Sequence, residues 1–304
     1  MYLCRLDARG TNSAEGIMAR FIAPDIETAA QACALILAVD DDPTNRSLLE
    51  RQLGRIGFAA EFAENGQQAW QMLQAGHGRY GLLLTDCQMP VMDGYELARR
   101  IRADEGEWDT PLPIVALSAS TLDGNGEKCF KAGMTDFLRK PASTKILDAK
   151  LTEHLPTAAT LRLPADTPVS PPASPQTSQA KNDLNILERG KGVLDLSVLQ
   201  GIVGDDWTII QSTLERFHVT NASDLHALDE ALGADNASQI GKIAHRIKGA
   251  TRAIGATKLA GYAEAIEKAG VGHDWETIHT TMPRFHAEMG HVNDFIAGMG
   301  DTDG

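Results

Sequence analysis

The chain has 304 residues, 43% of them apolar and 23% charged, with a formal net charge of −13 at pH 7. This composition is typical of a globular protein of about two domains and excludes a disordered or fibrous chain. The acidic balance argues against direct nucleic-acid binding, which normally needs a basic face, and the sequence contains no run of 18 apolar residues that would span a membrane.

The N-terminal part of the chain carries few structural signals. Residues 1–34 show no firm pattern and are expected to be a disordered N-terminal extension. The first ten residues lack the basic-then-apolar order of a signal peptide. The four cysteines have no disulfide or metal-ligand spacing, which favours a reducing compartment and a cytoplasmic location.

Residues 35–155 alternate short apolar runs with amphipathic stretches, which predicts an α/β doubly wound five-stranded parallel sheet. Asp42 is placed to cap the first helix. Gly124 and Gly126 predict that the fourth helix is mobile or starts late. The expected helices cover 44–56, 66–75, 94–103, 122–132 and 143–154. The expected strands are Leu35–Val39, Ala59–Phe62, Leu82–Thr85, Ile114–Leu117 and Asp136–Leu138.

A stretch rich in proline, serine and threonine follows. Six of the thirteen prolines lie between Pro156 and Pro175 without an apolar period, so residues 156–189 are expected to be a linker. Residues 190–300 show no strand signal and are expected to form an all-α helical bundle. Its predicted helices are Trp207–Leu232, Ser238–Ile254, Thr257–Ala269 and Trp275–Met299.

Aspartates follow two of the predicted strands directly. Asp40 and Asp41 come after the first strand, and Asp86 comes after the third. Ligands of a doubly wound sheet bind beyond the carboxyl ends of the strands where the strand order reverses. The three carboxylates are expected to converge there if the two strands are neighbours. Crowded carboxylates repel one another unless a cation joins them, and Mg²⁺ with oxygen ligands would meet this need.

A hydroxyl and an amine complete the predicted site. Ser118 ends the fourth strand and Lys140 ends the fifth, both at the same edge of the sheet. With a metal ion they would surround the equatorial oxygens of a transferring phosphoryl group, and Asp86 would be its nucleophile. Each residue alone is more often a helix cap or part of a solvated turn. The combination at successive strand ends supports the phosphoryl-transfer hypothesis.

The motifs of residues 35–155 resemble, in order and spacing, those of the response-regulator receiver family: ILAVDDDPTNR, LLLTDCQMPVMDGYEL, IVALSAS and AGMTDFLRKP. The resemblance implies a flavodoxin-like receiver domain in which Asp86 becomes a 4-aspartylphosphate. It also implies that Mg²⁺ is held by Asp40, Asp41, Asp86 and the backbone oxygen of Gln88.

The same resemblance implies roles for residues on the last two strands. Ser118 would be a switch residue, and Lys140 would contact the phosphoryl group. The peptide before Pro141 is expected to be cis. Phe137 stands where the family places an aromatic switch residue, although it could equally be an ordinary core phenylalanine.

One histidine of the C-terminal region stands out by its neighbours. On a helix turning 100° per residue, His245 lies about 160° from the middle of the apolar stripe and is expected to face solvent. Lys248 and Arg252 lie on the same side of the helix. Gly241 and Gly249 leave the turns above and below His245 without side chains. A solvated histidine on a polar face is the plain alternative.

The segment HRIKGATRAIGA resembles the histidine phosphotransfer (HPt) family. The resemblance implies that residues 190–300 are an HPt domain and that His245 is its phosphohistidine. Lys248, Gly249 and Arg252 would support the phosphoryl group.

Together the two resemblances imply a two-component phosphorelay protein, similar to the C-terminal part of a hybrid sensor histidine kinase of the virulence-sensor type. The receiver would accept a phosphoryl group on Asp86 from a phosphohistidine donor with Mg²⁺, and His245 would relay it to or from a receiver aspartate. The sequence has no P-loop, no GxGxxG after a strand and no Asn-rich ATP box. A histidine kinase partner would therefore supply the phosphoryl group, and a downstream response regulator would exchange it.

Two alternatives use the same residues differently. The chain could be a response regulator whose C-terminal helices are a non-phosphorylated output or protein-binding module, with His245 incidental. A DNA-binding version of that module would need more arginine and lysine on its helices. A dehalogenase-like enzyme would need its nucleophile in a DxD motif after the first strand, whereas the candidate nucleophile here follows the third.

Overall fold

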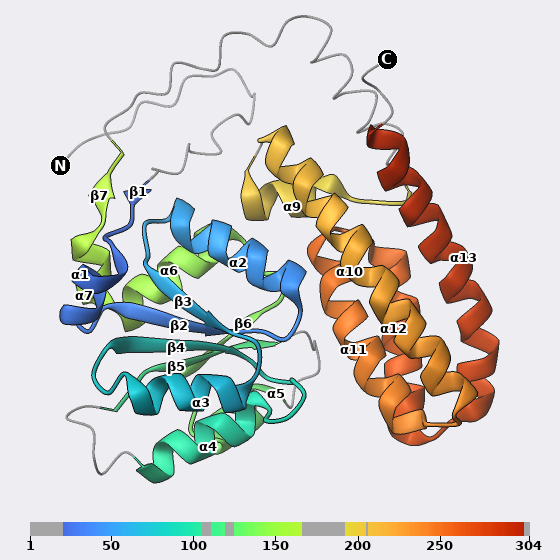
Figure 1. Cartoon of the computed structure of the whole chain (residues 1–304), viewed down its shortest axis with the longest axis horizontal. Helices are drawn as coiled ribbons and strands as arrows, with labels where there is room; N and C mark the ends of the chain where they lie inside the picture. Colours follow the sequence, from blue (N-terminus) through green and yellow to red (C-terminus); the bar gives the residue numbers. More distant parts are fainter. Residues whose placement is uncertain (1–20, 105–110, 119–124, 166–191, 205, 301–304) are drawn as a thin grey trace, which may run out of the picture.

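The structure, a computed structural model, describes residues 21–104, 111–118, 125–165, 192–204 and 206–300. Within them, an α/β domain and an all-α domain lie against each other (Figure 1). None of the described helices is long and apolar enough to cross a membrane.

Five parallel strands form a sheet in the order β3-β2-β4-β5-β6, which confirms the predicted doubly wound architecture. The strands are β2 (Leu35–Val39), β3 (Ala60–Ala63), β4 (Tyr80–Asp86), β5 (Ile114–Ser118) and β6 (Asp136–Arg139). Every residue of β2 and of β5 is buried, because helices cover both faces of the sheet. The strands that carry the aspartates, β2 and β4, are direct neighbours.

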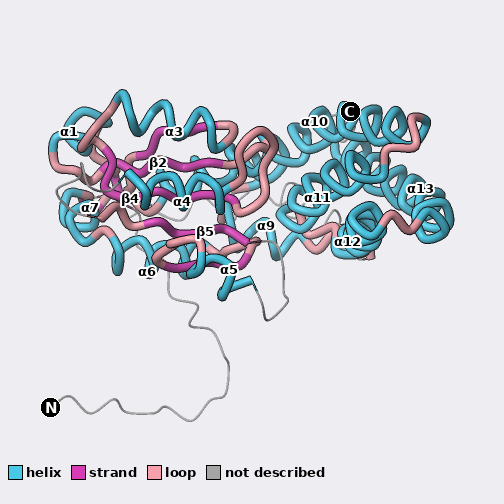
Figure 2. Tube along the Cα trace, turned by 90° about the horizontal axis from the view of Figure 1, so that it is seen from below, coloured by secondary structure: helices cyan, strands magenta, loops and turns pink. Residues whose placement is uncertain are grey.

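Five helices enclose this sheet: α2 (Pro43–Arg55), α3 (Gly66–Ala75), α4 (Gly94–Asp104), α5 (Asn125–Lys131) and α6 (Thr144–His154). Leu53 of α2 and Leu151 of α6 pack on one face, while Leu73 of α3 and Leu97 of α4 pack on the other. Figure 2 shows the strands between these helix layers. Residues 122–124, where α5 was expected to begin, lie outside the described residues, so its late start stays a prediction.

The all-α domain contains α10 (Trp207–Gly233), α11 (Ala237–Ala253), α12 (Thr257–Gly272) and α13 (Trp275–Gly300). These helices match the four predicted ones to within a few residues. A shorter helix, α9 (Leu196–Val203), precedes them and was not predicted. Its Leu199 belongs to the same buried core as Phe217 of α10 and Phe285 of α13.

Parts of the expected N-terminal extension and linker are ordered. β1 (Phe21–Ile22) pairs antiparallel with β7 (Leu163–Pro164). Two short helices, α1 (Ile26–Gln31) and α7 (Pro156–Leu161), contact β2 and α6.

The guanidinium of Arg162 holds these pieces by stacking on the rings of Phe21 and Phe58, at 4.3 and 5.0 Å from their centroids. The disorder expected for residues 21–34, and a linker beginning at residue 156, are therefore wrong. Such short elements leave no apolar period in the sequence to reveal them. Residues 1–20 and 166–189 lie outside the described residues.

Replacing Gly94, at the start of α4, and Gly54, in α2, by alanine should have opposite effects on stability. A Cβ on Gly94 would lie 2.1 Å from the carbonyl oxygen of Asp86, whereas a Cβ on Gly54 of α2 would meet nothing within 4 Å. Gly94→Ala should therefore lower the free energy of unfolding by about 1–3 kcal/mol. Gly54→Ala, the matched control, should raise it by roughly 0.5–1 kcal/mol. Urea denaturation of both variants measures these changes, and an unaltered Gly94→Ala protein would contradict the expected clash.

Candidate functional site

Three carboxylates meet at the carboxyl edge of the sheet. β2 and β4 run side by side with Val39 opposite Thr85, so the residues that follow or end them, Asp40, Asp41 and Asp86, come together. One carboxylate oxygen from each of the three lies within 4.8 Å of the others. Asp40 and Asp86 are almost fully buried. The convergence predicted from the strand order is therefore present.

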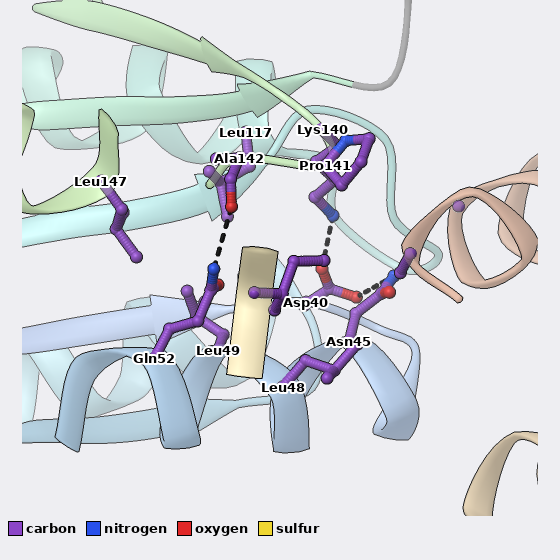
Figure 3. Close-up of a pocket in the computed structure, with 13 residues that line it drawn as sticks. Asp40, Asn45, Leu48, Leu49, Gln52, Leu117, Lys140, Pro141, Ala142 and Leu147 are labelled. Atoms are coloured by element: carbon purple, nitrogen blue, oxygen red, sulfur yellow. Dashed lines mark hydrogen bonds and ion pairs between the residues drawn. The ribbon is translucent and has the colours of Figure 1, made fainter. Parts of the chain in front are cut away.

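Lys140 reaches this cluster from the end of β6. Its Nζ donates to Oδ2 of Asp40 and to Oδ2 of Asp86, each at 2.5 Å. Figure 3 shows the ammonium beside Asp40. The backbone oxygen of Ser118 accepts a hydrogen bond from the backbone nitrogen of Lys140 at 2.8 Å. The peptide between Lys140 and Pro141 is cis, as the family resemblance implied.

Burial and neighbouring negative charges make Asp41 and Asp42 hard to ionise. Burial raises the pKa of Asp41 to about 7, and the charges of Asp40 and Asp86 add to the shift. Burial likewise raises the pKa of Asp42 to about 7, with a further contribution from Asp40. Burial lowers the pKa of Lys140, but Asp40 and Asp86 outweigh it and leave that pKa above its ordinary value.

A single ammonium among these carboxylates leaves negative charge uncompensated. The donors are all oxygen atoms on closely spaced side chains, which is the ligand set that a hard divalent cation such as Mg²⁺ prefers. The three clustered aspartates therefore fit the predicted metal ion. The backbone oxygen of Gln88 stays a predicted ligand. The backbone nitrogen of Gln88 donates to Oδ1 of Asp86 at 3.2 Å.

The predicted histidine lies on α11, but its surroundings differ from those expected. The side chain of His245 is only 14% exposed, and its Nδ1 lies 2.6 Å from Oε1 of Glu267 on α12. Lys248 is buried and donates to Oε2 of the same carboxylate. The expectation that His245 faces solvent is therefore wrong, and Lys248, predicted on the same side of the helix, is paired with Glu267. A helical wheel of α11 alone does not include α12, whose Glu267 packs beside this face.

Glu267 fixes the proton on the imidazole. Burial opposes ionisation of Glu267, but His245 and Lys248 outweigh it and hold the pKa of that carboxyl below its ordinary range. An ionised carboxylate only accepts hydrogen bonds, so Nδ1 of His245 carries the proton and donates it. In the neutral ring, the lone pair then lies on Nε2.

The two glycines beside His245 have different neighbours. A Cβ on Gly249 would lie 3.4 Å from Nδ2 of Asn45 in α2, so this bare position faces the α/β domain as expected. A Cβ on Gly241 would instead meet the backbone of α12 around Gly270. Gly241 thus allows two helices to approach closely. Arg252 donates to Glu264 of α12 at 2.9 Å.

Residues of both domains line one cavity of about 610 Å³. The α/β domain contributes Asp41, Gln88 and neighbouring loop residues, and the all-α domain contributes His245, Arg246 and Glu267. Residues at the predicted phosphoryl acceptor edge and the predicted phosphohistidine therefore line the same cavity.

Arg246 is a cation at this cavity that was not singled out from the sequence. Its Nε donates to the two carboxylate oxygens of Asp224 at 3.0 and 3.1 Å. Burial lowers the pKa of Arg246, but Asp224, then Asp41 and Asp42, outweigh it and raise it. Its position next to His245 in HRIKG was the available signal.

Phe137 is 40% exposed and packs edge-on against Phe130, with ring centroids 6.0 Å apart. It is therefore not an ordinary core residue. A Cβ on Gly126 would lie 2.9 Å from the Phe137 ring, so the glycine that weakens α5 also makes room for this ring. The switch roles of Phe137 and Ser118 stay predictions.

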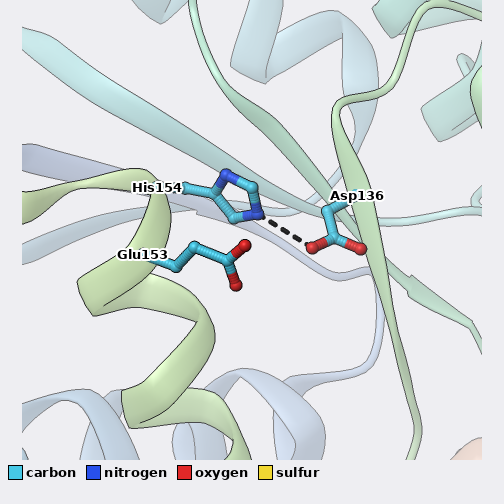
Figure 4. Close-up of side chains that lie close together, drawn as sticks. All are labelled: Asp136, Glu153 and His154. Atoms are coloured by element: carbon cyan, nitrogen blue, oxygen red, sulfur yellow. Dashed lines mark hydrogen bonds and ion pairs between the residues drawn. The ribbon is translucent and has the colours of Figure 1, made fainter.

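A second group of possible metal ligands lies at the opposite edge of the sheet, where β6 begins. Asp136, Glu153 and His154 lie close together (Figure 4). The Nε2 of His154 lies 2.8 Å from Oδ2 of Asp136, and Nζ of Lys150 donates to that same oxygen at 2.6 Å. The ammonium of Lys150 therefore already compensates the charge of this cluster.

An acidic sheet edge with its lysine, facing a carboxylate-oriented histidine across a shared cavity, defines a phosphoryl-relay protein. The family model "Response regulator receiver domain" matches residues 36–152, and the model "Hpt domain" matches residues 212–295. The chain therefore carries a response-regulator receiver domain followed by an Hpt domain, a combination that fits a phosphorelay protein. The Hpt match disfavours the alternative of a non-phosphorylated output module.

The curated relatives are much longer proteins. The chain is 31% identical over 239 residues to the sensor protein EvgS of Escherichia coli K12, which covers 79% of this chain and 17% of that protein. It is 31% identical over 246 residues to the virulence sensor protein BvgS of Bordetella bronchiseptica, which covers 80% of this chain and 19% of that protein. The chain thus spans about a fifth of the length of these relatives.

Two solved structures are similar to about two fifths of the chain. The receiver domain of the sensor histidine kinase PA1611 from Pseudomonas aeruginosa is 36% identical, with 40% of this chain and 98% of that chain covered and a TM-score of 0.36. The co-crystal structure of Ypd1 with the Ssk1 receiver domain from Saccharomyces cerevisiae gives 31% identity, 41% and 90% coverage and a TM-score of 0.38.

Glu267→Gln tests the orientation of the histidine. Glutamine can still meet Nδ1 but has no charge to hold the proton there, so the rate of phosphoryl transfer to His245 should fall roughly 10–100-fold, as for other groups that orient a functional histidine. Glu276→Gln, which changes an exposed glutamate at the start of α13, is the matched control and should leave the rate unchanged. Rapid-quench kinetics from a phosphorylated receiver measure both variants. Equal rates would remove Glu267 from the transfer site.

The same carboxylate predicts a pH dependence of stability. Because the pKa of Glu267 is lowered in the folded protein, its contribution is present above the unfolded pKa and is lost as the pH falls through the folded value. The stability difference between wild type and Glu267→Gln should therefore be largest near neutrality and shrink between roughly pH 5 and pH 3. Urea unfolding across this range measures the difference. A constant difference would contradict the ion-pair account.

Proposed function

We propose that Asp86 accepts a phosphoryl group from the phosphohistidine of a donor kinase and exchanges it with His245. The observation that carries this proposal is the cavity lined by Asp41 and Gln88 of the receiver domain and by His245 of the Hpt domain. It gives a phosphoryl group one space between an acidic edge and an imidazole.

The receiver residues divide the work at Asp86. Its carboxylate attacks phosphorus in line with the leaving histidine nitrogen, which keeps its electron pair. Lys140, already bonded to Asp86, would then neutralise charge on the phosphoryl oxygens, and the Ser118 hydroxyl would donate to one of them. A magnesium ion held by Asp40, Asp41, Asp86 and the Gln88 backbone oxygen would supply further charge neutralisation.

The Hpt residues divide the work at His245. Nε2 attacks phosphorus, the P–N bond forms as the P–O bond to Asp86 breaks, and the Asp86 carboxylate leaves with its electron pair. The imidazole becomes cationic, and Glu267 stabilises it through the proton on Nδ1. Lys248 acts through Glu267 rather than by facing the phosphoryl group. Gly249 leaves room for Asn45 of the receiver. The positive charge of Arg252 supports the phosphoryl group.

The partners follow from the same chemistry. A histidine kinase supplies the phosphoryl group, and the receiver of a downstream response regulator exchanges it with His245. Because the relatives are sensor proteins of which this chain spans about a fifth, we propose that the chain corresponds to the relay part of a hybrid sensor kinase. A cytoplasmic location belongs to this proposal.

Labelling from a phosphohistidine donor tests the assignment. Wild type incubated with a ³²P-labelled donor kinase and Mg²⁺ should carry alkali-labile label on Asp86 and acid-labile, alkali-stable label on His245. Asp86→Asn should accept no label from this donor, because its nucleophile is gone. His245→Gln should keep only the Asp86 label.

His226→Gln, which changes an exposed histidine of α10, is the matched control and should label as wild type does. Label on Asp86→Asn at the wild-type rate would contradict the acceptor assignment. Acid-labile label that does not depend on His245 would show that this histidine does not carry the phosphoryl group.

A further inference from the structure

Helix α9 lies outside the region that matches the Hpt model, since it ends at Val203 and the match begins at residue 212. It contacts both the receiver and the Hpt bundle: α2 and α6 on one side, α10 on the other. The described structure therefore has a helix at the domain boundary that the relay chemistry itself does not require.

A leucine of the receiver is buried in the core of the other domain. Leu48 of α2 is 4% exposed and belongs to the same apolar cluster as Leu199 and Ile202 of α9. Its neighbours Leu49 and Leu53 belong to the receiver's own core. Leu48 thus projects from the receiver, and α9 with the Hpt bundle covers it.

Polar contacts specify the same arrangement. Oγ1 of Thr144, at the start of α6, donates to the carbonyl oxygen of Ile202 at 2.7 Å. This carbonyl lies in the last turn of α9, where helical partners are lacking. Gly204, which follows α9 with φ of 85°, has no space for a Cβ because the guanidinium of Arg55 occupies it.

We propose that α9 is a docking helix that holds the receiver against the Hpt domain of the same chain, so that Asp86 and His245 exchange the phosphoryl group within one molecule. The partner of this receiver surface is therefore the chain's own Hpt domain rather than a second copy. The inference rests on the proposed function and adds its geometry. Docking in cis makes the transfer unimolecular, so its rate does not depend on protein concentration.

The test uses the full chain, phosphorylated on Asp86 with ³²P-acetyl phosphate and Mg²⁺. The half-time for label to move from Asp86 to His245 is measured over a 100-fold range of protein concentration. In wild type it should be constant. In Leu48→Glu, which places a charge in the apolar contact, transfer should be at least tenfold slower, because only the covalent linkage between the domains then brings Asp86 and His245 together.

Two further variants keep the result interpretable. Thr144→Val removes the hydroxyl bond to α9 and should slow transfer in the same direction with a smaller effect. Val219→Glu puts the same charge on an exposed position of α10 and should behave as wild type. Unchanged labelling of Asp86 by acetyl phosphate shows that the receiver of each variant is folded.

The possible failures are distinguishable. A wild-type half-time that shortens in proportion to concentration, or Leu48→Glu transfer at the wild-type rate, overturns docking in cis and leaves the relay assignment standing. A mixture of Asp86→Asn chains with phosphorylated His245→Gln chains provides the bimolecular reference. If no label reaches His245 even in this mixture or in wild type, the proposed function itself is wrong.

Discussion

Three carboxylates within 4.8 Å of one another are the constraint around which the receiver domain is arranged. They meet only because β2 and β4 are adjacent and parallel, and their repulsion in a buried setting calls for cations. Lys140 provides one from β6, and the all-oxygen donor set leaves room in its chemistry for a divalent ion. The high density of negative charge would thus favour binding of a divalent cation at this edge, and the cation would in turn favour the phosphoryl group.

In the Hpt domain, a single carboxylate, that of Glu267, contacts two basic side chains. Glu267 accepts hydrogen bonds from both His245 and Lys248, so it orients the imidazole and neutralises a buried ammonium at once. The close approach of α11 and α12 at Gly241 and Gly270 brings Glu267 within reach. The orientation of the His245 ring is therefore set by packing between two helices rather than by residues of the histidine motif alone.

Most of the α/β sheet and its edge could be predicted because alternating elements and residues at strand ends leave strong local patterns. Asp86 and Lys140 belong to this group, whereas the cis bond before Pro141 followed from the family resemblance. Glu267 could not be predicted, because it is 22 residues from His245 and looks like any helical glutamate. Lys248 was misplaced for the same reason, since a single-helix projection omits the packed neighbour. Helix α9 and the ordered ends of the linker were too short to show a period.

The shared cavity has a consequence for the order of events. The acidic edge and His245 line the same cavity, so in the proposed relay a donor kinase and the chain's own Hpt domain would compete for access to Asp86. Phosphorylation of Asp86 by the donor and transfer from Asp86 to His245 would then have to alternate. The lifetime of the docked receiver and Hpt domains, set by contacts such as those of Leu48, would then limit the turnover rate of the relay.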